Sequence, residues 1–207
     1  MSIKKAYNDW AEGYDINSNK TIDLDKKASM ETLRKFNFSK VIELGCGTGK
    51  NTVFLLEKTD EIIALDFSEN RLAKAKEKIK DERVVLKKRD ITTSWNIKND
   101  FADLVTCSLI LEHIKDLNLV FKQVSETLKN DGIFFVSELH PFKQYSGSEA
   151  RYETEEGTQE LETHVHHISE YIAVAKKNGL KLMELKEWFD EDNKSEIPRL
   201  IGLVFQN

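Results

Sequence analysis

The chain contains the run Val41-Ile42-Glu43-Leu44-Gly45-Cys46-Gly47-Thr48-Gly49, in which an apolar segment is followed by three glycines, one at every second position. Because glycine has no Cβ, it adopts positive φ easily and lets a ligand approach the backbone. Residues 51–58 come next and are predicted to form a helix. The run therefore predicts a junction of strand, loop and helix, which is where open α/β sheets bind ligands.

Two common ligand classes of glycine-rich loops fit this run poorly. Dinucleotide-binding loops follow the pattern G-x-G-x-x-G, and Lys50 holds the position of their third glycine. Phosphate-binding P-loops end in Gly-Lys-Ser or Gly-Lys-Thr, whereas Gly49 and Lys50 are followed by Asn51. The spacing therefore argues against a P-loop and weakens the interpretation as a dinucleotide site.

Between residues 39 and 136, short apolar segments alternate with longer helical patterns, as expected of βαβ units and a parallel sheet. Strands are predicted at residues 41–44, 62–65, 84–87, 102–107 and 132–138. Further helices are predicted at residues 6–17, 23–36, 69–80 and 117–128. The last of these helices is expected to stop at Asn130-Asp131-Gly132.

The C-terminal third is expected to complete the sheet. Regular structure is predicted to end at His140-Pro141, and residues 142–163 form a long polar stretch, which favours an ordered active-site cover or a mobile segment. A helix at residues 168–177 and strands at 180–188 and 199–205 follow. Because the connection between the two strands is short, we expect a hairpin-like return and an antiparallel strand added to the sheet.

Composition and charge limit the classes of partner. The chain has 207 residues, a formal charge of −5 and a pI near 5.7, so no nucleic-acid partner is expected. The two cysteines, Cys46 and Cys107, lie in apolar strand-like segments, which favours buried thiols and a cytoplasmic location. No segment approaches the roughly 20 apolar residues of a membrane span or resembles a signal peptide, so no membrane association is expected.

Carboxylates end two of the predicted strands. Asp66 follows the second strand, where it can accept hydrogen bonds from both hydroxyls of a ribose. Its alternative role is to cap the helix that begins near Ser68, although Ser68 is itself a good N-cap. Asp90 closes the third strand at the same edge and is placed to accept a hydrogen bond from an adenine amine. These positions indicate an adenosine-type ligand.

Five segments, in this order, resemble the class I S-adenosylmethionine-dependent methyltransferases, particularly the group that acts on small molecules. They are Glu43 to Gly49, Asp66-Phe67-Ser68, Arg89-Asp90-Ile91, Phe101 to Leu104 with Leu111-Glu112-His113, and Leu128 to Gly132. The resemblance implies a Rossmann-like, seven-stranded, mostly parallel sheet with one antiparallel strand near the C-terminus and helices on both faces. It also implies S-adenosyl-L-methionine as cofactor and S-adenosyl-L-homocysteine as product.

The same resemblance assigns the cofactor-binding residues. Those along the methionine part would be Glu43, which orients the loop, with Gly45, Cys46, Gly47, Ser108 and Leu109. Those around the adenosine would be Asp66, Phe67, Ser68, Asp90 and Ile91. Two further residues would serve the cofactor side or close over the cofactor, namely His113 and Tyr14.

Whether the reaction needs a general base depends on the acceptor. A sulfonium methyl group is electrophilic, so the protein mainly has to align a nucleophile and exclude water. A base matters only for an acceptor that must lose a proton, and histidine suits that task near pH 7. His140 follows the fifth strand and His166 lies after the polar segment, so both are candidate catalytic residues. The three histidines near residue 166 lack a recognisable ligand spacing, so no metal is expected.

We expect one methyltransferase domain over residues 1–207. Its parts would be an N-terminal helical lid at 1–37, a cofactor-binding core at 38–139, an acceptor-side cover at 140–167 and the C-terminal helix and strands at 168–207. Tyr7, Trp10 and Tyr14 either pack in the core or belong to the lid. The predicted function is methyl transfer to O, N or C of a small-molecule acceptor, by a monomer or homodimer. A nucleotide-cofactor oxidoreductase and a non-catalytic binding module are the alternatives.

Overall fold

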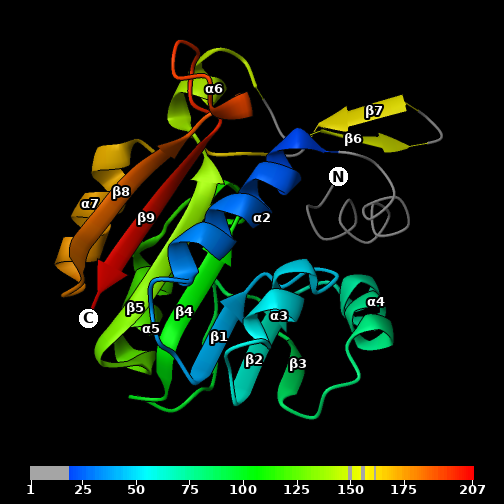
Figure 1. Cartoon of the computed structure of the whole chain (residues 1–207), viewed down its shortest axis with the longest axis vertical. Helices are drawn as coiled ribbons and strands as arrows, with labels where there is room; N and C mark the ends of the chain where they lie inside the picture. The colour runs from blue at the N-terminus through cyan, green and yellow to red at the C-terminus, as the bar shows by residue number, and fades with distance from the viewer. Residues whose placement is uncertain (1–18, 149–150, 155–156, 161) are drawn as a thin grey trace.

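The computed structural model describes residues 19–148, 151–154, 157–160 and 162–207. A seven-stranded sheet runs through it in the order β3-β2-β1-β4-β5-β9-β8 (Figure 1). The strands are β1 (Lys40–Leu44), β2 (Glu61–Asp66), β3 (Val84–Lys88), β4 (Ala102–Ser108), β5 (Leu128–Leu139), β8 (Lys181–Trp188) and β9 (Leu200–Gln206). β1 to β5 are parallel, β9 is antiparallel to β5, and β8 is antiparallel to β9. Only β9 opposes the other strands of this sheet, which confirms the predicted fold class.

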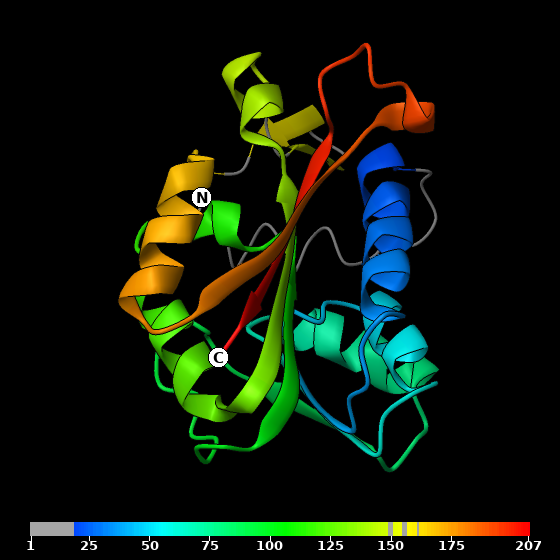
Figure 2. The ribbon, with the colours of Figure 1, turned by 60° about the vertical axis from the view of Figure 1, so that its left-hand side comes forward.

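Helices cover both faces of the sheet, as Figure 2 shows. One face carries α2 (Lys20–Leu33), α3 (Lys50–Leu55) and α4 (Glu69–Lys78), and the other carries α5 (Asn118–Thr127) and α7 (Ile168–Lys177). Each layer buries apolar side chains against the sheet. Phe121 of α5 contacts Phe134 of β5 with ring centroids 5.2 Å apart. On the opposite face, Leu33 and Leu55 are fully buried beside β1 and β2.

The junction of α5 and β5 differs from its prediction. The helix ends at Thr127 and the strand begins at Leu128, so the stop predicted at residues 130–132 was wrong. Leu128 takes extended dihedral angles and pairs with Ala102 of β4, where its side chain is completely buried. Pairing and burial at Leu128 therefore end the helix before the glycine does.

Regular structure also continues beyond His140, contrary to the prediction. The chain forms α6 (Pro141–Tyr145), then β6 (Arg151–Thr154) and β7 (Gly157–Glu160), which pair as an antiparallel hairpin. Proline favours the first position of a helix because it has no N–H to satisfy there. The Nδ1 atom of His140 accepts a hydrogen bond from the N–H of Phe142 at 3.2 Å and so caps α6.

The predicted C-terminal hairpin is confirmed by the pairing of β8 with β9. Two short 3-10 helices, η1 (Leu111–His113) and η2 (Asp190–Asp192), complete the described elements. Arg199 donates two hydrogen bonds of 2.5 Å to Asp190 and one of 3.1 Å to Thr21 in the first turn of α2. This contact joins the hairpin to the start of α2. The helix begins at Lys20, and Asn19 is its N-cap.

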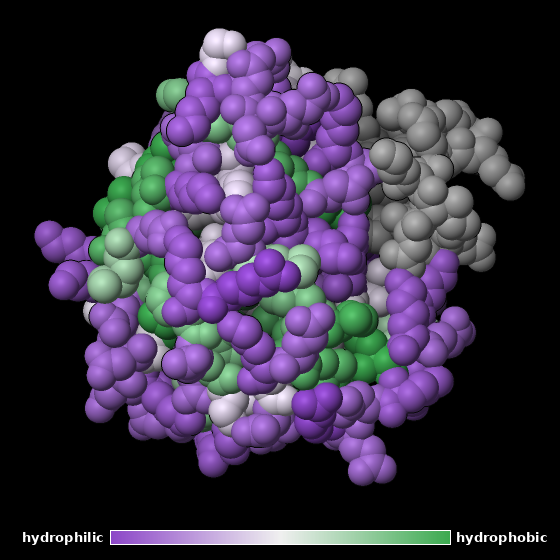
Figure 3. Space-filling view, viewed as in Figure 1, coloured by the Kyte–Doolittle hydropathy of each residue, from purple (hydrophilic) through white to green (hydrophobic). Residues whose placement is uncertain are grey.

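Charged pairs continue this connection along α2. Lys27 lies 3.0 Å from Asp192, and Lys35, just after the helix, lies 2.8 Å from Glu184 of β8. The face that carries α2 is largely hydrophilic in Figure 3. The solvent side of α2 is thus held to the C-terminal hairpin by ion pairs, while its other side packs on the sheet. None of the helices in the described ranges is long and apolar enough to cross a membrane.

Candidate functional site

The glycine loop lies between the end of β1 and the start of α3, at the carboxyl edge of the sheet. Gly45 has a φ of +68°, and a Cβ at this position would lie 2.4 Å from Cδ1 of Ile110. The N–H of Cys46 donates to the carbonyl of Leu65 at 3.0 Å, which ties the loop to β2. Backbone conformation and close packing therefore both require glycine at position 45.

Asp66 connects the end of β2 to this loop. Its Oδ2 accepts from the N–H of Gly47 and its Oδ1 accepts from the N–H of Ser68, both at 2.8 Å. Only 3% of the residue is exposed, and burial raises the pKa of its carboxyl while hydrogen bonds from the backbone of Ser68, Gly47 and Phe67, and the charge of Arg71, lower it. Each carboxylate oxygen has two lone pairs, so each can accept a further hydrogen bond. The helix cap itself is Ser68, whose hydroxyl accepts from the N–H of Arg71 at 3.2 Å.

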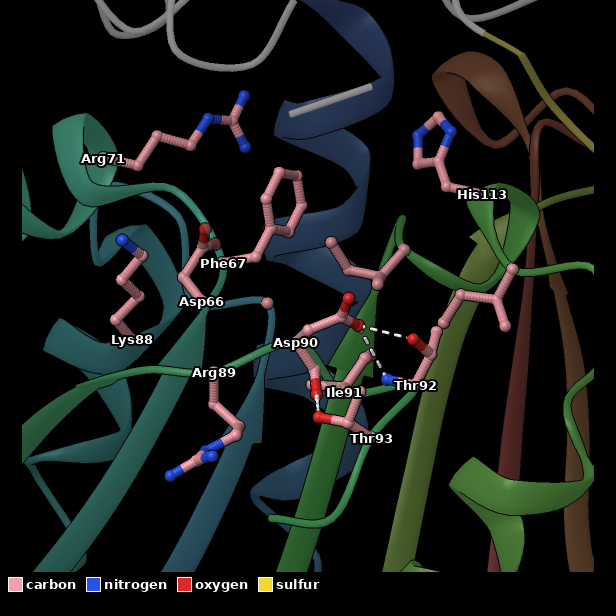
Figure 4. Close-up of a pocket in the computed structure, with 13 residues that line it drawn as sticks. Asp66, Phe67, Arg71, Lys88, Arg89, Asp90, Ile91, Thr92, Thr93 and His113 are labelled. Carbon is pink, nitrogen blue, oxygen red and sulfur yellow. Dashed lines mark hydrogen bonds between the residues drawn. The ribbon is translucent and has the colours of Figure 1, made fainter. Parts of the chain in front are cut away.

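A cavity of about 490 Å³ opens beside Asp66, and Figure 4 shows the side chains around it. Its lining residues are Gly45, Asp66, Phe67, Arg71, Lys88, Arg89, Asp90, Ile91, Thr92, Thr93, Ile110, His113 and Ile114. In Figure 4 the ring of Phe67 projects between Arg71 and His113. The cavity therefore combines a carboxylate, an aromatic ring and several isoleucines, which suits a ligand with a planar apolar part and hydroxyl groups.

Asp90 and Ile91 form the side of the cavity beyond β3. Oδ1 of Asp90 accepts from the N–H of Thr92 at 2.9 Å and from its hydroxyl at 2.6 Å, as the dashed lines in Figure 4 show. The carbonyl of Asp90 accepts from the hydroxyl of Thr93 at 2.8 Å. Ile91 is 7% exposed and belongs to the core. This turn is thus fixed by its own side chains.

Glu43 and Cys46 lie on the opposite side of the loop and are both buried. Oε2 of Glu43 accepts from the hydroxyl of Thr52 at 2.5 Å, so Glu43 joins β1 to α3. Burial, together with the nearby charges of Asp66 and Asp25, raises the pKa of Glu43 to about 8, although the hydrogen bond from Thr52 acts in the opposite direction. Burial likewise raises the pKa of the Cys46 thiol. A buried, largely neutral thiol is chemically inert, so Cys46 serves packing.

A second, smaller cavity of about 40 Å³ lies on this side. Its lining residues are Asp25, Glu43, Leu44, Gly45, Cys46, Lys50, Asn51, Thr106 and Ser108. Gly45 lines both cavities, so they meet at the first glycine of the loop. Leu109 has a φ of +56° and packs near Ala28 and Trp188, and it lines neither cavity.

Ile110 is held in place by Glu138 at the end of β5. Oε1 of Glu138 accepts from the N–H of Ile110 at 2.9 Å and from the N–H of Leu111 at 2.8 Å. Glu138 is completely buried, and burial raises its pKa well above the usual range. Since Ile110 touches the place where a side chain on Gly45 would lie, Glu138 indirectly shapes the cavity wall.

Among the described residues that line the two cavities, His113 is the one histidine. Its Nδ1 donates to the carbonyl of Glu162 at 3.2 Å, and its Nε2 lies 3.8 Å from Oε1 of Glu112. Burial lowers the pKa of the His113 imidazole. Its neighbour Glu112 accepts a hydrogen bond from the side-chain amide of Gln144 at 3.1 Å. Burial raises the pKa of Glu112 to about 7.

The two histidines predicted as catalytic line neither cavity. His140 is completely buried, caps α6 through Nδ1, and has its Nε2 3.3 Å from Glu187. His166 is 7% exposed, and its Nε2 donates to the carbonyl of Ile114 at 2.8 Å. The structure gives both rings structural contacts and does not bring them to the ligand side of the loop. Their catalytic role stays a prediction without a geometric basis here.

Tyr14 lies outside the described residues, as do Tyr7 and Trp10. Asp25 was missed, although a signal existed: it shares a helix face with Ala28, Ser29, Thr32 and Leu33, all buried. The described part of the chain contains no cluster of potential metal ligands.

Comparison with known proteins supports one family. A family model described as a methyltransferase domain matches residues 42–136. An uncharacterized methyltransferase of Emericella nidulans is 26% identical over 219 residues, covering 87% of this chain and 76% of the relative. Several other curated relatives are longer, and the chain spans 44% to 63% of their length.

Solved structures share the fold. A proposed S-adenosylmethionine-dependent methyltransferase of Listeria monocytogenes superposes with a TM-score of 0.77 at 22% identity, covering 90% of this chain and 99% of that one. DhpI, solved in a complex with SAM and HEP, gives a TM-score of 0.78 at 19% identity with both chains fully covered. The domain match shows a methyltransferase domain over residues 42–136, and the topology of the sheet together with these structural similarities shows that the chain has the class I fold of S-adenosylmethionine-dependent methyltransferases.

Proposed function

We propose that this protein binds S-adenosylmethionine in the large cavity and transfers its methyl group to a small-molecule acceptor. The observation that carries the proposal is Asp66, a buried carboxylate fixed by two backbone N–H groups where the 490 Å³ cavity meets the glycine loop. Its remaining lone pairs suit two neighbouring hydroxyls, as on a ribose. When bound, S-adenosylmethionine supplies an electrophilic methyl group on a positively charged sulfur.

In this proposal, the residues around Asp66 contact different parts of the adenosine. Phe67 and the isoleucines at positions 91, 110 and 114 enclose the base, and the turn that begins at Asp90 borders its polar edge. Gly45 lets the ligand pass against bare backbone toward the small cavity. The task of these residues is to hold the methyl donor and exclude water.

The acceptor is proposed as a small molecule with a nucleophilic O, N or C atom. The formal charge of −5 supports this class over nucleic acid. Relatives named for demethylmenaquinone and for malonyl-[acyl-carrier protein] match comparably well, at 31% and 28% identity, so they favour no single acceptor. Of the cavity-lining side chains described, His113 is the best-placed candidate base, since burial keeps its imidazole neutral.

Transfer of a labelled methyl group from S-adenosylmethionine to a metabolite extract tests the proposed activity. We expect label to appear in a low-molecular-weight product with the wild-type chain and to fall at least tenfold with Asp66→Asn. The matched control is Asp131→Asn, which makes the same change at the opposite end of the sheet, where Asp131 accepts from Gln206 at 3.2 Å. Equal transfer by the wild type and Asp66→Asn would contradict the role of Asp66.

A further inference from the structure

Asp25 is a buried acid for which the fold alone gives no reason. It lies on α2 with 4% of its surface exposed, facing the sheet. Oδ2 accepts from Nδ2 of Asn51 at 3.3 Å, whereas Oδ1 has no hydrogen-bond partner in the part of the chain that the structure describes. Burying a carboxylate without full hydrogen bonding is costly, so such a group calls for an explanation.

The surroundings of Asp25 are rich in oxygen atoms. Asp25 and Ser108 both line the small cavity, and Ser137 on the next strand lies close to the carboxylate. The hydroxyls of Ser108 and Ser137 make no close hydrogen bond among the described residues, yet both lie near enough to Asp25 to lower its pKa by hydrogen bonding. Lys50 also lines the small cavity, and its charge lowers the pKa of Asp25, while its Nζ lies 3.3 Å from Oδ1 of Asp23. The Asp25 carboxylate on α2 and the hydroxyls of Ser108 on β4 and Ser137 on β5 thus lie together beside the small cavity.

Size and chemistry restrict which ligand group fits the small cavity. A cavity of about 40 Å³ has room for one group of about the size of a water molecule. A carboxylate flanked by hydroxyl oxygens attracts a positively charged donor, and a primary ammonium offers three N–H bonds. The small cavity therefore suits an ammonium group at the end of a longer ligand.

The position of the small cavity identifies that ligand. Both cavities share Gly45, so a ligand whose ribose lies at Asp66 reaches the small cavity along the glycine loop. We propose that Asp25, assisted by Ser108 and Ser137, binds the α-ammonium group of the methionyl end of S-adenosylmethionine. This assignment rests on the proposed function. It places a specificity-determining residue on α2, outside the matched domain at residues 42–136.

The charge state of Asp25 is compatible with this role. Burial raises the pKa of Asp25 to about 6, and the hydroxyl of Ser137, the amide of Asn51 and the hydroxyl of Ser108 act in the opposite direction. The group is therefore mostly ionised at pH 7.5 and carries the charge that an ammonium needs. A neutral amide at this position keeps the shape of the side chain and loses that charge.

Calorimetric titration of Asp25→Asn with two ligands tests the assignment. The ligands are S-adenosylhomocysteine and its analogue in which hydrogen replaces the α-amino group. We expect the variant to bind S-adenosylhomocysteine roughly 10- to 100-fold more weakly than the wild type, as for loss of a charged hydrogen bond. The variant and the wild type should bind the deaminated analogue equally. Glu31→Gln is the matched control, because Glu31 lies on the exposed side of α2 and pairs with Lys186 at 3.5 Å.

The outcomes separate this assignment from the proposed function. If Asp25→Asn binds S-adenosylhomocysteine as tightly as the wild type, or loses both ligands equally, Asp25 does not contact the ammonium and the assignment is wrong. A wild-type chain that binds neither ligand contradicts the proposed function, and with it this assignment. Thermal unfolding of each variant checks the fold. If Asp25→Asn does not fold, Ser108→Ala supplies the same comparison. We expect Ser108→Ala to bind S-adenosylhomocysteine more weakly than the wild type and to bind the deaminated analogue equally well. If it binds both ligands as the wild type does, the assignment is wrong.

Discussion

Replacing Gly45 by alanine separates two demands on the glycine loop, its backbone conformation and its packing. Gly45 has a φ of +68°, and its added Cβ would lie 2.4 Å from Cδ1 and 2.5 Å from Cγ1 of Ile110. Gly147 provides the matched control, since its φ is +86° and a Cβ there would meet nothing within 4 Å. Both variants force alanine into the left-handed region, while only Gly45→Ala also creates an overlap.

The expected magnitudes follow from this difference. Left-handed backbone costs alanine about 1 kcal/mol, so Gly147→Ala should destabilise the protein by that amount. Overpacking adds about 1–3 kcal/mol, which brings Gly45→Ala to about 2–4 kcal/mol. Because Ile110 lines the large cavity, its displacement should also weaken binding of S-adenosylhomocysteine at least tenfold.

Urea denaturation and calorimetric titration of the two variants measure these effects. Adding Ile110→Ala to Gly45→Ala should recover the overlap part of the loss and leave the backbone part. If Gly45→Ala and Gly147→Ala lose the same stability, or if Gly45→Ala binds S-adenosylhomocysteine as the wild type does, the reasoning about Ile110 is wrong.

Two further predictions concern buried acids. Burial raises the pKa of Asp25 from 3.8 to about 6, so the folded state holds its proton more tightly and wild-type stability falls as pH rises from about 4 to 6. Asp25→Asn should therefore be more stable than the wild type by about 3 kcal/mol at pH 7.5 and by nearly nothing at pH 3, in urea denaturation at both pH values. A difference that does not change with pH would show that Asp25 does not titrate in this way. Glu138 accepts two backbone N–H bonds, so Glu138→Ala should cost about 2–4 kcal/mol, while Glu138→Gln keeps an acceptor and should cost little. If both variants lose the same stability, packing alone accounts for the cost and the hydrogen bonds do not.

Local patterns allowed the glycine loop and its acidic partner to be predicted from the sequence. A strand that ends in spaced glycines, followed by a second strand that ends in Asp66, needs only neighbouring residues to be recognised. The structure places both at one edge of the sheet, where the N–H of Gly47 donates to Asp66. The order of apolar and helical segments likewise predicted the sheet and its antiparallel strand.

Residues whose environment depends on distant contacts were harder to predict. The fifth strand begins at Leu128 because that side chain is buried against β4, which no local turn signal shows. His140 follows a strand at the correct edge, yet its ring is buried and caps α6. Asp25 sits among ordinary helix residues, and only the packing of α2 over β5 and β9 reveals that it faces a cavity. In these cases the sequence did not show in which direction the side chain points.

We infer that the two cavities around Gly45 together hold S-adenosylmethionine. Calorimetric titration of the wild-type chain with S-adenosylhomocysteine, paired with Asp66→Asn, tests it most directly. We expect one molecule bound per chain with micromolar affinity, a rise in melting temperature with ligand concentration, and weaker binding by the variant. No binding heat and no change in melting temperature for the folded wild type would contradict it.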